Sequence, residues 1–185
     1  MDRKYVTETV LADTAGIARG VDILRAGGLV AVPTETVYGL AARADSEEAV
    51  GQIFEAKGRP AFNPLIVHLP DAEAVEAYCV LDDTARRLAA AFWPGALTLV
   101  LPRRDESVSL LVSAGLETLA VRVPSHPVAQ ALLTEAGVPV AAPSANKAGC
   151  ISPTVAGHGA FSLPGPGKGG PDMILDGGPC HVGVE

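Results

Sequence analysis

Two positively charged side chains alternate in the segment Lys57-Gly58-Arg59-Pro60, where a predicted helix ends. An arginine presents a planar fork that pairs with phosphate oxygens, and a lysine adds a compact positive charge. Gly58 allows the chain to turn so that Lys57 and Arg59 point the same way. The segment therefore suits a phosphate-binding site, although two cations that only complement the dipole of a helix C-terminus would look the same.

A second polar segment, Pro143-Ser144-Ala145-Asn146-Lys147-Ala148-Gly149, follows a predicted buried strand and consists mostly of small residues. Small side chains allow main-chain N–H groups to approach an anion closely. Ser144 adds a hydroxyl group and Asn146 adds an amide, so the segment also suits a phosphate or a nucleotide. An ordinary turn has the same composition, and the segment alone does not decide between the two.

Arg122 and His68 stand among apolar residues on predicted buried strands. Burying a guanidinium without an anion is costly, so Arg122 requires either a structural ion pair or the carboxylate of a ligand. A single histidine on an apolar strand is more often a hydrogen-bonded core residue than a catalytic group. Thr34, Thr36 and Tyr38 bring hydroxyl groups to another predicted strand end, where they fit a turn or a ligand contact.

Helices alternate with short apolar strands along the chain, which predicts an α/β protein with a sheet covered on both faces. Several strands end at a proline followed by small polar residues. Because ligands of open α/β sheets bind beyond the strand ends, we expect these loops to carry the chemistry. The pattern predicts helices over residues 14–26, 46–57, 71–78, 82–92 and 127–136, and strands over 29–32, 65–69, 97–101, 119–123, 138–142 and 173–175.

The composition excludes several classes of protein. The chain has 185 residues, a net charge of -7 and 4% aromatic residues, which excludes a generally basic nucleic-acid binder and an aromatic base-stacking surface. Its three cysteines are too few and too widely spaced for a zinc site, and they fit a reducing compartment. The N-terminal residues do not form a signal peptide, and no apolar run approaches the roughly 20 residues of a membrane span. We therefore expect a cytoplasmic protein with no membrane partner.

The common nucleotide-binding motifs give no alternative site. Gly167-Lys168 is followed by Gly169 rather than by serine or threonine, so there is no Walker A loop. The G-x-G-x-x-G string over residues 165–170 contains Pro166 and follows no predicted strand. The sequence also lacks the G-x-S-x-G and H-E-x-x-H motifs.

The polar segments occur in one order along the chain, and together they form a specific combination. The strings are Pro33-Thr34-Glu35-Thr36-Val37-Tyr38-Gly39-Leu40, Lys57-Gly58-Arg59-Pro60, Asn63-Pro64-Leu65-Ile66-Val67-His68, Trp93-Pro94-Gly95 with Leu97-Thr98, Val121-Arg122-Val123-Pro124, Pro143-Ser144-Ala145-Asn146 and Ser152-Pro153-Thr154. This combination resembles the YrdC family, the L-threonylcarbamoyladenylate synthases, from about Ala15 to Glu185.

The resemblance implies a twisted α/β fold whose mixed parallel and antiparallel sheet, with flanking helices, surrounds a large cationic cavity. It implies an adenylyl transfer that forms threonylcarbamoyl-AMP and pyrophosphate from L-threonine, bicarbonate and ATP, for the threonylcarbamoyladenosine modification of tRNA. The product would pass to a threonylcarbamoyltransferase, and we do not expect this chain to bind tRNA directly. Mg²⁺ would arrive with ATP, and no protein side chain is expected to hold a metal.

The resemblance also assigns roles to individual residues. Its catalytic signature falls on Lys57, Arg59, Ser144 and Asn146. The residues expected to contact ATP are Lys57, Arg59, Asn63, Thr118, Ser144, Asn146 and Ser152. The residues expected to contact threonine are Thr34, Thr36, His68, Arg122 and Ala142.

The chain departs from the family pattern in two places. It stops where the family continues with a Ser-Thr pair and a further β segment, so we expect one YrdC-like domain over residues 1–185 without its C-terminal end. Residues 157–171 are rich in glycine and proline, and we expect them to form an exposed loop. Two alternative functions stay open: an RNA-binding module without catalysis, and the carbamoyl-adenylate-forming domain of a carbamoyltransferase.

Overall fold

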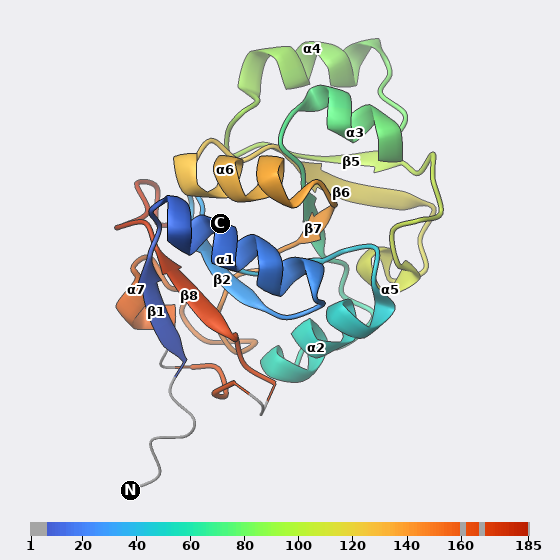
Figure 1. The fold of residues 1–185 in the computed structure, drawn as a ribbon. Helices are drawn as coiled ribbons and strands as arrows, with labels where there is room; N and C mark the ends of the chain where they lie inside the picture. Colours follow the sequence, from blue (N-terminus) through green and yellow to red (C-terminus); the bar gives the residue numbers. More distant parts are fainter. Residues whose placement is uncertain (1–6, 160–161, 167–168, 185) are drawn as a thin grey trace, which may run out of the picture.

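The computed structural model describes residues 7–159, 162–166 and 169–184. Within them one eight-stranded sheet has the strand order β1-β8-β2-β3-β7-β4-β6-β5 and carries helices on both faces (Figure 1). The strands are β1 (Glu8–Leu11), β2 (Val30–Pro33), β3 (Tyr38–Arg43), β4 (Ile66–His68), β5 (Thr98–Pro102), β6 (Thr118–Arg122), β7 (Val140–Ala141) and β8 (Met173–Asp176). The helices are α1 (Thr14–Arg25), α2 (Glu47–Lys57), α3 (Ala72–Tyr78), α4 (Asp83–Phe92), α5 (Leu110–Ser113), α6 (Pro127–Ala136) and α7 (Ala156–Gly159).

The sheet mixes parallel and antiparallel pairs, as the resemblance implies. Strand β8 runs parallel to both β1 and β2, and β4 runs parallel to β6. The pairs β2–β3, β3–β7, β7–β4 and β6–β5 are antiparallel. The α/β fold class is therefore confirmed.

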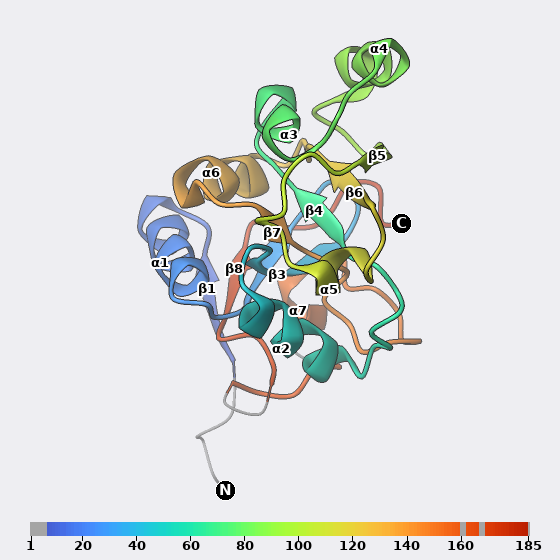
Figure 2. The ribbon, with the colours of Figure 1, turned by 90° about the vertical axis from the view of Figure 1, so that its right-hand side faces the viewer.

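Two hydrophobic clusters cover the two faces of the sheet. Helices α1 and α6 pack against one face, and α2 and α5 pack against the other (Figures 1 and 2). Strand β8 shows the alternation directly, because Met173 and Leu175 belong to the first cluster while Ile174 belongs to the second.

Local signals mark the helix ends where the sequence predicts them. The side chain of Asp13 caps α1 by accepting a hydrogen bond from the N–H of Gly16, and Ser46 caps α2 in the same way. Gly58 and Gly137 end α2 and α6 with left-handed φ angles of 58° and 64°. Gly58 therefore performs the turn that brings Arg59 out of the helix.

The structure corrects several expectations. Strands β1 and β3 and helices α5 and α7 are not predicted from the sequence, and Tyr38, expected beyond a strand end, is the first residue of β3. The segment 157–171 is not a wholly exposed loop in its described part, because Leu163 is buried in the core and Pro171 is buried beside β8. No helix in the described ranges is long and apolar enough to cross a membrane.

Candidate functional site

The sheet face that α1 and α6 cover continues beyond α6 onto β4, β6 and β5, where it is open. In register, Thr98 lies opposite Arg122, and Arg122 lies beside His68. Along β5, Val100 on this face is 67% exposed, whereas Leu101 on the opposite face is 6% exposed. A ligand can therefore reach the sheet directly at this end.

A cavity of about 460 Å³ occupies the open end of the sheet. It brings together Arg59, Arg122 and Ser144, which the sequence places in three separate segments. Figure 2 shows the C-terminal end of the chain beside β4 and β6, in agreement with Val182 and Val184 lining the same cavity. A hollow of about 530 Å³ between β5 and α5 contains none of the residues assigned to ATP or threonine.

Lys57 lies behind the cavity wall and is only 1% exposed. Its ammonium group donates hydrogen bonds to the main-chain carbonyls of Ser144 and, at 2.5 Å, Asn146. The carbonyl of Lys57 in turn accepts a hydrogen bond from the N–H of Ala148 at 3.0 Å. Lys57 therefore holds the 144–148 loop against the end of α2, which is a structural task in addition to any electrostatic one.

Asn146 holds the same loop together from within. Its amide donates to the carbonyls of Cys150, at 2.6 Å, and Lys147, at 3.1 Å, and its amide oxygen accepts from the hydroxyl of Ser152 at 3.4 Å. Asn146 is 5% exposed, whereas Ser144 lines the cavity. This network leaves Ser144 as the member of the loop signature that faces the ligand space.

Arg59 fixes the loop on the other side of the cavity. Its guanidinium donates to the main-chain carbonyls of Asn63, at 3.3 Å, and Pro64, at 3.0 Å. Asn63 contributes to this site through its backbone, and its side chain is exposed. Thr118, the remaining residue assigned to ATP, begins β6 opposite Pro102.

Arg122 is 6% exposed and forms a buried ion pair with Glu35, which is 8% exposed. Its Nη2 lies 2.5 Å from Oε1 of Glu35 and 3.1 Å from the hydroxyl of Thr36, and Oε2 of Glu35 accepts from the N–H of Ser125 at 3.1 Å. Burial favours a raised pKa for Glu35, but the hydrogen bonds and the charge of Arg122 hold that pKa below its ordinary value. Glu35 is therefore a carboxylate at neutral pH.

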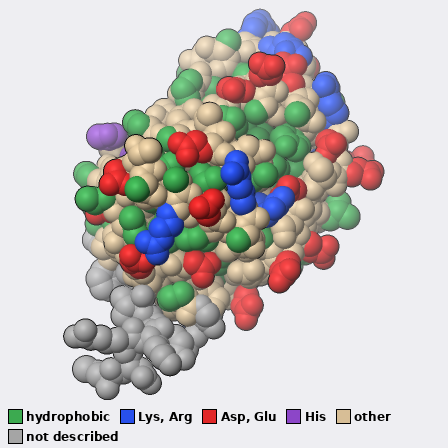
Figure 3. Space-filling view, in the orientation of Figure 1, with side chains coloured by type: hydrophobic (Ala, Val, Ile, Leu, Met, Phe, Trp, Pro, Cys, Tyr) green, Lys and Arg blue, Asp and Glu red, His purple; other side chains and the backbone are tan. Residues whose placement is uncertain are grey.

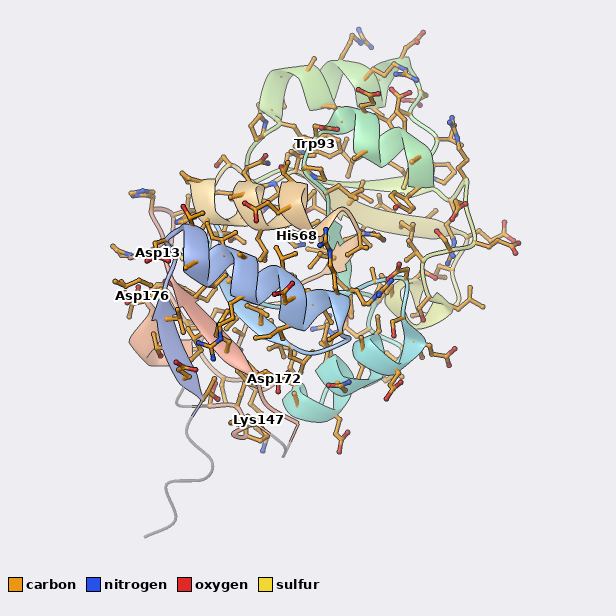
Figure 4. All side chains as sticks on the ribbon, in the orientation of Figure 1. Asp13, His68, Trp93, Lys147, Asp172 and Asp176 are labelled. Carbon is orange, nitrogen blue, oxygen red and sulfur yellow. The ribbon has the colours of Figure 1, made fainter. Side chains whose placement is uncertain are left out.

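His68 lies beside α6, near the centre of the molecule in Figure 4, and its Nδ1 is 3.2 Å from the carbonyl of Ile66. Burial and the nearby charge of Arg122 lower the pKa of His68 to about 4, so the imidazole is neutral at physiological pH. A carbonyl only accepts, so Nδ1 carries the proton. Together with Thr34 and Ala142, His68 borders a small apolar hollow of about 10 Å³ beneath α6.

The five residues assigned to threonine thus form two adjacent groups. Thr36 and Arg122 line the large cavity, whereas Thr34, His68 and Ala142 border the small hollow. The hydroxyl groups of Thr34 and Thr36 lie 3.0 Å apart and join the two groups. No set of three or more histidine, cysteine, aspartate or glutamate side chains in the described part of the chain is arranged to hold a metal ion.

The segment that follows β8 completes the cavity wall. The N–H groups of Val182 and Gly183 donate to the carbonyls of Glu35, at 2.9 Å, and Thr36, at 3.0 Å. The hydroxyl of Tyr38 donates to the carbonyl of Gly178 at 2.8 Å, and burial raises the pKa of Tyr38 to about 12.

From the sequence, no role is assigned to Glu35. The signal that could have found it is Arg122, because a buried arginine needs an anion as its partner.

Several known proteins resemble this chain in sequence and in fold. A threonylcarbamoyl-AMP synthase of Bacillus subtilis is 49% identical over 181 residues, which are 97% of this chain and 51% of that protein. A crystal structure of Pyrococcus abyssi Sua5 complexed with L-threonine superposes with a TM-score of 0.88 at 46% identity, covering 97% of this chain and 52% of that chain. This chain therefore spans about half the length of these relatives.

The fold is shared more widely than the sequence. Full-length HypF in a phosphate- and nucleotide-bound form matches with a TM-score of 0.78 at 23% identity, covering 91% of this chain and 26% of that one, and this likeness concerns the fold alone. The family model Sua5_yciO_yrdC, described as "Telomere recombination", matches residues 22–185. With most of its length matched, the chain belongs to the Sua5/YciO/YrdC family.

Proposed function

We propose that this chain is the synthase domain of a threonylcarbamoyl-AMP synthase, which converts L-threonine, bicarbonate and ATP into threonylcarbamoyl-AMP and pyrophosphate. The observation that carries the proposal is the meeting of Arg59, Arg122 and Ser144 around one cavity of about 460 Å³. An amino-acid carboxylate and a triphosphate are both anions, and the reaction requires them side by side. The names and identities of the relatives support the same assignment.

The chemistry needs no nucleophile from the protein. The threonine amine adds to bicarbonate-derived CO₂ to give a carbamate, a proton leaves, and water is released overall. A carbamate oxygen then attacks the α-phosphorus of ATP, and the bond to the departing pyrophosphate breaks. Adenylyl transfer of this kind depends on positioning and on positive groups near the developing charge.

The residues around the cavity suit these two tasks. Arg122 would bind the threonine carboxylate, since a charge-assisted hydrogen bond of this type contributes about 1.5–3 kcal/mol. Arg59 and Ser144 would contact the phosphates, and Lys57 and Asn146 would keep the 144–148 loop in place for them. Mg²⁺ would enter bound to ATP and supply charge neutralisation at the phosphates. Thr118 and Ser152 remain proposed nucleotide contacts, and Asn63 acts through its backbone.

The small hollow under α6 supports threonine over serine as the substrate. Its volume of about 10 Å³ is close to one water-sized body, and its lining is apolar apart from Thr34 and His68. A methyl group fits such a space without an unmet hydrogen bond. A single methyl group discriminates by about 10–200-fold, which sets the expected preference over serine.

We further propose that the product is passed, in the cytoplasm, to a threonylcarbamoyltransferase that modifies tRNA. A role as an RNA-binding module is less favoured, because the net charge is -7 and, on the one face seen in Figure 3, Lys and Arg are intermixed with Asp and Glu. The second alternative is the carbamoyl-adenylate-forming domain of a carbamoyltransferase. Its support is the likeness of fold to HypF, at 23% identity.

The direct test is the release of pyrophosphate from ATP with and without L-threonine and bicarbonate. We expect turnover that requires both, with serine supporting it poorly. Turnover independent of threonine, or tight and salt-sensitive tRNA binding without any turnover, would contradict the proposal. Arg59→Ala is expected to lower kcat for pyrophosphate release, since its charge matters most as that group departs.

A further inference from the structure

Glu35 is a buried carboxylate that the family signature leaves without a task. It is 8% exposed, and it contacts Arg122 at 2.5 Å through one oxygen and the N–H of Ser125 at 3.1 Å through the other. Its main-chain carbonyl also accepts from Val182, which lines the cavity. Glu35 is thus held from three directions and cannot turn away from Arg122 without breaking several hydrogen bonds.

This arrangement limits how Arg122 can meet a ligand. Nη2 is engaged by Glu35 and Thr36, and Nε points to the carbonyl of Gly95 at 3.4 Å. Within the part of the chain that the structure describes, Nη1 makes no hydrogen bond, and Arg122 lines the cavity. One edge of the guanidinium is therefore presented to the ligand space.

The ion pair also changes the charge that a ligand meets. The formal charges of Glu35 and Arg122 cancel, and an anion bound at Nη1 comes close to the Glu35 carboxylate on the neighbouring nitrogen. By Coulomb's law the attraction to Arg122 and the repulsion from Glu35 both grow in proportion to the charge of the ligand, so the Glu35 carboxylate cancels most of the advantage that a doubly charged phosphate would have over a carboxylate at an unpaired arginine. Because the site is partly buried, dissolved salt screens this charge-dependent effect only weakly.

We infer that Glu35 is a specificity-determining residue, which reserves Arg122 for a singly charged carboxylate and keeps the phosphates on the Arg59 side of the cavity. This inference rests on the proposed function, because that reaction places two kinds of anion in one cavity. Without such a residue, a polyphosphate could occupy Arg122 and exclude the amino acid.

The test observes Arg122 itself. In ¹⁵N–¹H spectra of the whole chain, the Nε–H signal of Arg122 is identified by its loss in Arg122→Lys, and acetate, pyrophosphate and L-threonine are titrated separately. For the unaltered chain we expect acetate to shift the signal, and pyrophosphate to need at least as high a concentration for the same shift in spite of its larger charge. In Glu35→Gln, we expect the affinity of pyrophosphate at Arg122 to rise at least about tenfold relative to that of acetate.

Two further variants control the experiment. Glu35→Asp keeps the charge and should keep the ratio of the acetate and pyrophosphate affinities found in the unaltered chain. Asp45→Asn removes a carboxylate from the Arg43–Asp45 pair, at 2.7 Å and outside the cavity, and should leave the Arg122 titrations unchanged. Should Glu35→Gln fail to fold, the unaltered chain and Glu35→Asp still decide the question.

The inference is overturned if pyrophosphate shifts Arg122 in the unaltered chain at a lower concentration than acetate does, if acetate gives no shift, or if Glu35→Gln leaves the ratio of the two affinities unchanged. The L-threonine titration judges the proposed function separately. A chain in which acetate and pyrophosphate behave as expected but threonine does not reach Arg122 would contradict the synthase assignment and support the role of Glu35.

Discussion

Replacing Lys57 by methionine tests whether this residue holds the 144–148 loop. Lys57 is 1% exposed, and its ammonium donates to the carbonyls of Ser144 and Asn146. Methionine preserves most of the volume and removes the donor. Each of the two buried carbonyls left without a partner costs about 1–3 kcal/mol, so we expect the free energy of unfolding to fall by about 2–6 kcal/mol.

The loss can be measured by calorimetry. For a chain of this length each kcal/mol lowers Tm by about 2–4 °C, so Lys57→Met should melt roughly 4–24 °C below the unaltered chain. Lys147→Met is the matched control, because Lys147 belongs to the same loop and has the same charge but is exposed. Its free energy of unfolding should change by less than about 0.5 kcal/mol.

Proteolysis adds a local readout for the same pair of variants. If Lys57 anchors the loop, then limited proteolysis near residues 144–152 should be faster in Lys57→Met and unchanged in Lys147→Met. Equal melting temperatures for the two variants, with turnover lost only in Lys57→Met, would refute the anchoring role and indicate direct contact with the phosphates instead.

Three other substitutions test further parts of the site. Arg122→Ala should raise KM for threonine by about tenfold or more while KM for ATP changes less than about twofold, and equal effects on both would remove its assignment. Because folding lowers the pKa of His68 to about 4, the unfolded chain binds the proton first, and the free energy of unfolding should fall by about 3 kcal/mol between pH 6.5 and pH 4. Urea unfolding of His68→Asn should lack this part of the pH dependence, and an unchanged slope would contradict the assignment. Tyr38→Phe removes the 2.8 Å hydrogen bond to Gly178 and should lower the free energy of unfolding by about 1 kcal/mol, more than Tyr78→Phe does in the same denaturation assay.

Helix positions follow closely from local sequence. The cap at Asp13 and the left-handed glycines Gly58 and Gly137 act on neighbouring residues, so they can be read without the rest of the chain. Strand β3 could not be predicted in this way. Its sequence includes Gly39 and a run of alanines with weak strand preference, and its pairing with β2 and β7 stabilises it instead.

Strand β1 illustrates the same limit at greater distance. Glu8–Leu11 is a short and mostly exposed segment, and it forms a strand because it pairs in parallel with β8 at the other end of the chain. Such pairing depends on the assembled sheet. No local pattern in the first ten residues predicts strand β1.

The residue types alone made Arg59, Arg122 and the 143–149 loop anion-binding candidates, although a helix C-terminus, a structural ion pair and an ordinary turn would each have explained one of them. Tertiary packing determines which groups these side chains contact. It turned the Lys57 ammonium toward the carbonyls of its neighbouring loop, and it supplied Arg122 with a counter-charge from Glu35, 87 positions away. Side-chain chemistry is a local property, whereas the partner of a buried charge is chosen by the tertiary contacts that remove both groups from water.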